Sequence, residues 1–102
     1  MTSRERLPNR RGSETFTLEQ RYIASFSRFD DGRVAEIFLQ DHKPGSQSDS
    51  NARDSAIAAS LALQYGCPLD VLRRALLRDA QSRASTPLGV ALDFIAGQEE
   101  RG

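Results

Sequence analysis

The sequence predicts an α+β domain in which a three-stranded antiparallel sheet is followed by three helices packed on one face of it. Two observations predict this order. Apolar and polar residues alternate through residues 14–40, whereas alanine and leucine recur with helical spacing after residue 51. The chain has 102 residues, of which 38% are hydrophobic and 27% charged, as is typical of one folded domain.

The predicted strands are residues 14–19, 21–29 and 33–40. Asp30-Asp31-Gly32 separates the last two, because aspartate suits turn positions and Gly32 can adopt a positive φ at no steric cost. We therefore interpret 21–40 as a hairpin to which 14–19 adds a third strand. The residues that share a face are Phe16 with Leu18, Tyr22 with Ala24 and Phe26, and Ala35 with Ile37 and Leu39.

A polar loop over residues 41–51 is predicted to lead into a first helix over 51–65. The loop contains no apolar residue that could anchor a strand or helix. The helix is rich in alanine, which favours close packing on its neighbours, and Gly66 follows as its C-terminal cap. The plausible N-cap residues are Asp49, Ser50 and Asn51.

Two further helices follow. Pro68 suits the first turn of a helix over 69–78, in which Leu69, Leu72 and Leu76 form one stripe. Its arginines, which are Arg73, Arg74 and Arg78, are expected to face outward. Thr86 is the predicted N-cap of the third helix, which Pro87 opens and Gly97 closes.

The chain is predicted to divide into a flexible basic arm at 1–12, the folded domain at 13–97 and a disordered tail at 98–102. No apolar stretch is long enough to span a membrane, and no secretory signal is recognisable at the start. A single cysteine, Cys67, allows no internal disulfide. These features predict a cytoplasmic protein without membrane contact.

The loop after the third strand is the most suggestive site. Lys43, the Ser46 hydroxyl and the start of the following helix together suit an anion such as a phosphate, and His42 and Gly45 belong to the same loop. The alternative is a solvated turn that leads into a capped helix. The glycine spacing does not fit a nucleotide-binding P-loop.

Two other features have alternatives of their own. Cys67 is either a small buried residue at a helix junction or a reactive thiol, for which His42 would be the only histidine base. The basic arm is either a linker or a nucleic-acid contact, although it lacks aromatic residues that could stack on bases. No residues show the spacing of metal ligands or of paired catalytic carboxylates.

Two segments together resemble the C-terminal TSCPD-type domain of adenosylcobalamin-dependent (class II) ribonucleotide reductases. Arg4-Glu5-Arg6-Leu7-Pro8-Asn9-Arg10-Arg11 is similar to the linker before that domain. The second segment begins at Asp31-Gly32-Arg33. It continues through Glu36-Ile37-Phe38, His42-Lys43, Gly45, Ala56-Ile57-Ala58, Ser60-Leu61, Leu63-Gln64-Tyr65-Gly66 and Pro68-Leu69.

The resemblance implies a role in deoxyribonucleotide supply, with adenosylcobalamin as the cofactor of the related full-length enzymes. It also implies a reaction that needs one cysteine for a thiyl radical and two more for reducing electrons. Because this chain has one cysteine, we expect no catalytic residues and no cofactor bound by it.

Three hypotheses follow. The first is a stand-alone accessory domain that binds a reductase subunit, itself or a nucleotide through the hairpin or the Arg73, Arg74 and Arg78 surface. The second is one component of a split cobalamin-dependent reductase. The third is a small partner- or nucleotide-binding module unrelated to reductase activity.

Overall fold

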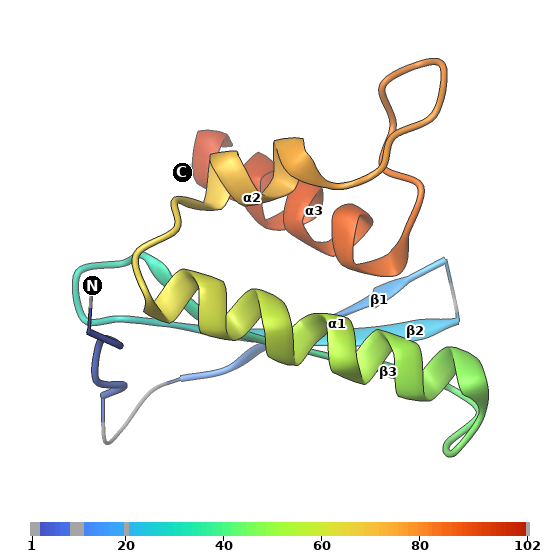
Figure 1. The fold of residues 1–102 in the computed structure, drawn as a ribbon, viewed down its shortest axis with the longest axis horizontal. Helices are drawn as coiled ribbons and strands as arrows, with labels where there is room; N and C mark the ends of the chain where they lie inside the picture. Colours follow the sequence, from blue (N-terminus) through green and yellow to red (C-terminus); the bar gives the residue numbers. More distant parts are fainter. Residues whose placement is uncertain (1–2, 9–11, 20, 102) are drawn as a thin grey trace.

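The computed structural model describes residues 3–8, 12–19 and 21–101. It confirms the predicted α+β order of three strands followed by three helices (Figure 1). The elements are β1 (Glu14–Leu18), β2 (Tyr22–Arg28), β3 (Val34–Asp41), α1 (Gln47–Gln64), α2 (Leu69–Ala75) and α3 (Pro87–Arg101).

The sheet is antiparallel throughout, with the strand order β1-β2-β3. Its register places Ala24 opposite Leu39 and Phe26 opposite Ile37, so the residues that share a face in sequence meet across the strands. Gly32 has φ of +93° in the turn between β2 and β3, as its position after two aspartates predicts.

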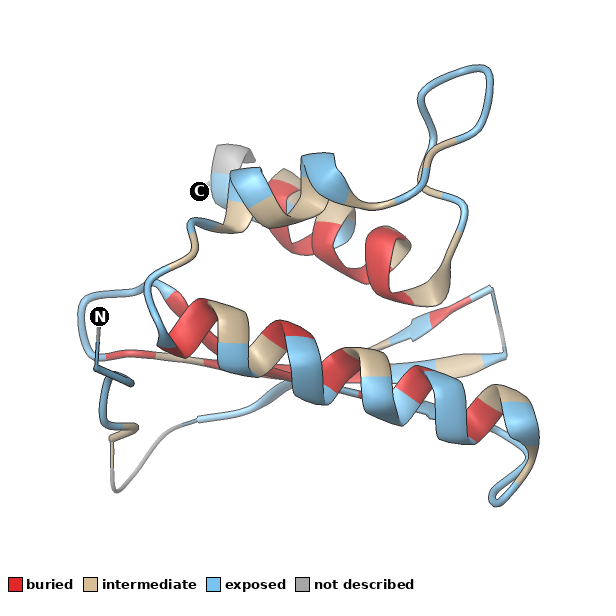
Figure 2. Ribbon diagram, viewed as in Figure 1, coloured by how far each residue is buried: buried red, intermediate tan, exposed pale blue. Residues whose placement is uncertain are grey.

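All three helices pack on one side of the sheet, and α1 lies along β3 (Figure 1). In Figure 2 the buried residues of α3 face α1 and the sheet. The largest fully buried side chains come from both layers, which shows that the core lies between sheet and helices. They are Phe26, Ile37, Leu92 and Ile95.

The first helix begins at Gln47, four residues before the predicted start. Its N-cap is Ser46, whose Oγ accepts a hydrogen bond from the backbone N–H of Asp49 at 3.1 Å. The prediction of a cap at residues 49–51 was therefore wrong. The missed signal is the pair Ser46-x-x-Asp49, in which the hydroxyl caps the first turn and the carboxylate accepts from the loop N–H groups of Asp41 and Gly45.

The other two helices also depart from their predicted ends. α2 stops at Ala75, and Arg78 instead forms an isolated antiparallel bridge with Ala84 at the base of a loop. α3 starts as predicted, since Thr86 Oγ1 accepts from the N–H of Gly89 at 3.2 Å. It then continues through Gly97 to Arg101, so the predicted helix end was wrong, while disorder of the tail stays a prediction.

The described part of the N-terminal arm is held against the domain. Glu5 N donates to the carbonyl of Gln64 at 2.6 Å, and the Glu5 carboxylate pairs with Arg33 at 2.7 Å. Arg4 Nε donates to the side chain of Gln64. Flexibility of the arm over residues 1–12 stays a prediction, and its basic positions 10 and 11 lie outside the described residues.

Candidate functional site

The outer edge of β3 is covered by side chains of α1. Ser60 Oγ accepts from the N–H of Ile37 at 2.9 Å and lies 3.0 Å from its carbonyl oxygen, to which it donates. Gln64 Nε2 donates to the carbonyl of Ala35 at 3.0 Å. The spacing fits because four helical residues rise about 6 Å, close to the length of two strand residues. The N–H and C=O of Ile37 and the C=O of Ala35 are therefore not available to pair with another strand.

A groove of about 660 Å³ lies between α1 and the face of the sheet that the helices leave open. Ile23 and Phe38 project from the strands, and Ile57 and Leu61 project from α1. These four side chains are 38%, 54%, 59% and 39% exposed, respectively. The groove is therefore an apolar surface that no other described part of the chain covers.

Two arginines line the groove. Arg53 Nε pairs with Asp49 at 2.9 Å, and Arg4 bonds to Gln64 at the opposite end of α1. Among the described lining residues the single acid is Glu36, which is 8% exposed and accepts from the hydroxyl of Ser27 at 2.8 Å. The groove therefore combines an apolar floor with two exposed arginines, of which Arg53 is already ion-paired with Asp49.

The predicted anion site lies in the loop between β3 and α1, where the chain's own carboxylates take up the backbone donors. Asp49 accepts from the N–H groups of Asp41 at 2.9 Å and Gly45 at 3.1 Å, and Asp41 accepts from the N–H of Lys43 at 3.3 Å. Ser46 Oγ donates to the carbonyl of Lys43 at 2.9 Å. The loop is thus internally bonded, and anion binding by it stays a prediction.

The same contacts lower the pKa values of the Asp41 and Asp49 carboxyl groups. The backbone N–H groups of Asp41 and Gly45, together with Arg53, hold the pKa of Asp49 below its ordinary value. Burial acts to raise the pKa of Asp41, but the N–H of Lys43 and the charge of Arg21 outweigh it and lower the pKa. Both groups are therefore anions at neutral pH. His42 Nδ1 lies 3.0 Å from Asp41 Oδ1, so the histidine belongs to this loop cluster.

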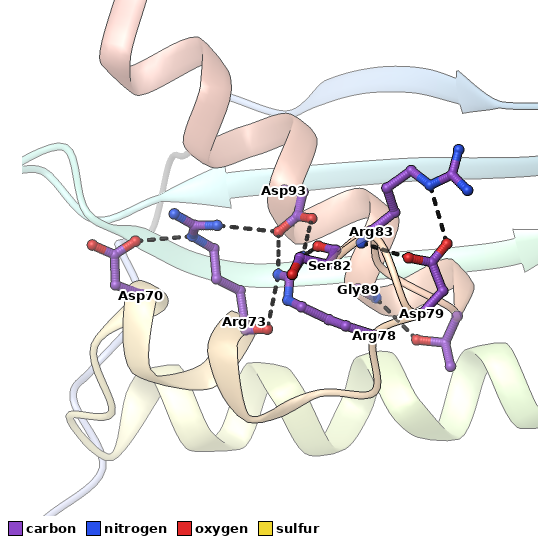
Figure 3. Close-up of polar contacts among 9 residues, drawn as sticks. Asp70, Arg73, Arg78, Asp79, Ser82, Arg83, Gly89 and Asp93 are labelled. Atoms are coloured by element: carbon purple, nitrogen blue, oxygen red, sulfur yellow. Dashed lines mark hydrogen bonds and ion pairs between the residues drawn. The ribbon is translucent and has the colours of Figure 1, made fainter.

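The predicted arginine surface is instead largely a structural network centred on Asp93 of α3 (Figure 3). Arg78 donates from Nη1 and Nη2 to the two oxygens of Asp93 at 2.8 and 2.7 Å. It also donates to the carbonyls of Ser82 and Arg73. Arg73 contacts Asp93 at 3.3 Å and pairs with Asp70 at 2.9 Å. The network fastens α2 and the following loop onto α3.

The prediction that all three arginines face outward was therefore wrong for two of them. The side chains of Arg73 and Arg78 are 21% and 23% exposed, whereas Arg74 is exposed. The hydrogen bonds from Arg78 lower the pKa of Asp93, against an opposing effect of burial. Only Arg74 of the three retains the outward position expected of a partner contact.

The sequence of this chain is similar to a short part of two much longer proteins. It is 42% identical over 74 residues to the vitamin B12-dependent ribonucleotide reductase of Bradyrhizobium diazoefficiens, covering 69% of this chain. It is 41% identical over 70 residues to the enzyme of that name from Agrobacterium fabrum, covering 66% of this chain.

The chain is homologous to a segment of vitamin B12-dependent ribonucleotide reductases. The matched region is 6% of each reductase's length. No family model matches the chain, and no solved structure matches it.

This reductase homologue does not bring Cys67 and His42 together. His42 precedes α1 and Cys67 follows it, so the 18 residues of the helix separate them by about 27 Å. The sulfur lies 3.6 Å from the carbonyl oxygen of Pro68. A thiol activated by this histidine is therefore excluded by the fold.

The groove of the reductase homologue does not fit a whole cobalamin. Its volume of about 660 Å³ suits a ligand of drug size rather than a corrinoid. Among the residues that the structure describes, no cluster of three or more metal-ligating side chains exists. No helix in the described ranges is long and apolar enough to cross a membrane.

The groove was not predicted from the sequence of this homologue. The alanine-rich helix was expected to pack closely on its neighbours, and its alanines do face the core, whereas Ile57 and Leu61 lie on an exposed face. The only available signal was the large number of alanines on α1, which leave the larger side chains for another face.

Proposed function

We propose that this domain is an accessory, non-catalytic part of the ribonucleotide reduction system and acts by binding a cobalamin-dependent reductase polypeptide. The observation that carries the proposal is the 42% identity to a segment of such a reductase. The open apolar groove supports it, because a patch of this kind is typical of a protein–protein contact.

Thiol chemistry supports the non-catalytic part of the proposal. The resemblance implies a reaction with one cysteine for the radical and two for the reducing electrons, whereas these 102 residues contain Cys67 alone. The histidine that could activate this thiol lies at the other end of α1. Radical chemistry and cobalamin binding then belong to the partner polypeptide.

The test uses the full chain and the purified cobalamin-dependent reductase of the same organism. Light scattering coupled to size exclusion is expected to show a complex of the two. Turnover of a ribonucleotide is expected to be absent for the chain alone and to change for the reductase when the chain is added. Turnover by the chain alone would refute the non-catalytic role, and a reductase that neither binds nor responds would refute the accessory role.

A further inference from the structure

We propose that the groove between α1 and the open face of the sheet docks an amphipathic helix that carries carboxylates. This inference rests on the proposed function, because the reductase polypeptide is the partner that would supply the helix. Its starting observation is that four large apolar side chains are each more than a third exposed along one groove.

The neighbouring edge of β3 is poorly suited to the main alternative, in which a partner adds a strand there. Ser60 and Gln64 bond to the backbone of Ile37 and Ala35, and Asp49 bonds to that of Asp41. A partner strand would have to displace these side chains before it could pair with Ile37, with the C=O of Ala35 or with the N–H of Asp41. Recognition through side chains in an apolar groove is the mode that amphipathic helices use.

The charges of the groove select an acidic partner. Arg53 lines one end and Arg4 is bonded to Gln64 at the other, while the one acid among the described lining residues, Glu36, is 8% exposed. Carboxylates on the partner would bind these two guanidinium groups, both of which are exposed and line the groove.

The length of the groove sets the size of the helix. Arg53 and Gln64 are eleven positions apart on α1, which corresponds to about 16 Å or three helical turns. Ile57 and Leu61 lie between them, so the docked helix would present apolar residues at intervals of three and four with an acid near each end.

The N-terminal arm contributes Arg4 to the groove, and the bonds of the neighbouring Glu5 hold the arm in place. The carboxylate of Glu5 pairs with Arg33 through both oxygens at 2.7 Å, and its N–H bonds to Gln64. These bonds hold the adjoining Arg4 in the groove. Glu5 and Arg33 are thus positioning residues for one of the two charges that select the partner.

The test measures the Kd of the full chain for the purified reductase with two matched pairs of variants. Ile57→Glu places a negative charge in the groove, and Val71→Glu places one at a position of equal exposure on α2 (59% and 58%). Arg53→Gln removes a groove charge, and Arg83→Gln removes an arginine that likewise pairs with an aspartate four positions earlier. Each groove variant is expected to weaken binding about tenfold and each control less than about twofold.

Photo-cross-linking identifies the docked segment. With p-benzoylphenylalanine replacing Phe38, we expect the cross-link to fall on an acidic amphipathic helix of the reductase. Binding that the groove variants leave unchanged, or a cross-link to an extended or basic segment, would overturn the inference and leave the proposed function standing. A reductase that does not bind the wild-type chain would overturn both.

Discussion

Replacing Ser60 with alanine is expected to destabilise the domain because it leaves two backbone groups at the edge of β3 without their hydrogen-bond partner. The Ser60 hydroxyl serves both the N–H and the C=O of Ile37, at 2.9 and 3.0 Å. Ile37 is 1% exposed, so its N–H would lose its partner in a buried place.

The expected loss is about 2 kcal/mol. An unsatisfied buried backbone donor costs about 1–3 kcal/mol. The higher helix propensity of alanine offsets about 0.5 kcal/mol of the lost unfolding free energy.

Urea unfolding followed by circular dichroism measures the effect, with Ser50→Ala as the matched control. Ser50 is exposed on the same helix and its hydroxyl makes no described hydrogen bond, so its replacement is expected to change the free energy of unfolding by no more than about 0.5 kcal/mol. If the two variants differ by less than about 0.5 kcal/mol, the Ser60 hydroxyl does not satisfy the backbone of Ile37.

Further predictions concern Asp93. Asp93→Asn is expected to cost about 1–2 kcal/mol of unfolding free energy, since it removes charge-assisted bonds from Arg78 at a carboxylate that is 30% exposed. Asp54→Asn, at an exposed position of α1, serves as the control and is expected to change it by less than about 0.5 kcal/mol. The folded-state pKa of Asp93 is lowered, so its contribution is present above the ordinary value of 3.8 and is lost as pH falls through the folded value. Urea titrations at several acidic pH values are expected to show a shallower loss in Asp93→Asn than in wild type, and equal slopes would contradict the role of this ion pair.

The sheet and its buried face could be predicted because they depend on local alternation. Ala24 and Phe26 face the core, as do Ile37 and Leu39, since a period of two fixes the side of each residue once the strand forms. Helix ends were harder to predict. In the sequence Ser46 and Asp49 look like polar loop residues. Only their bonds to each other and to the loop show that they belong to the start of α1.

The candidate site could not be predicted because its members come from distant parts of the chain. Arg4 enters the groove through contacts with Gln64, sixty positions away. Arg73 and Arg78 have the spacing of solvent-facing residues, and only the approach of Asp93 on α3 turns them inward. Charge pairing between elements depends on how those elements pack, and sequence periodicity does not specify that packing.

By itself the sequence determined the α+β class, the order of its elements, the likeness to a reductase segment and the presence of a single thiol. The tertiary structure decided which surfaces remain for a partner. Small alanines let α1 settle against β3 and cover its edge, and the same rotation of the helix leaves Ile57 and Leu61 facing the open side of the sheet. A helix buries one face and exposes the opposite one, and which face is buried is set by the strand that the helix meets.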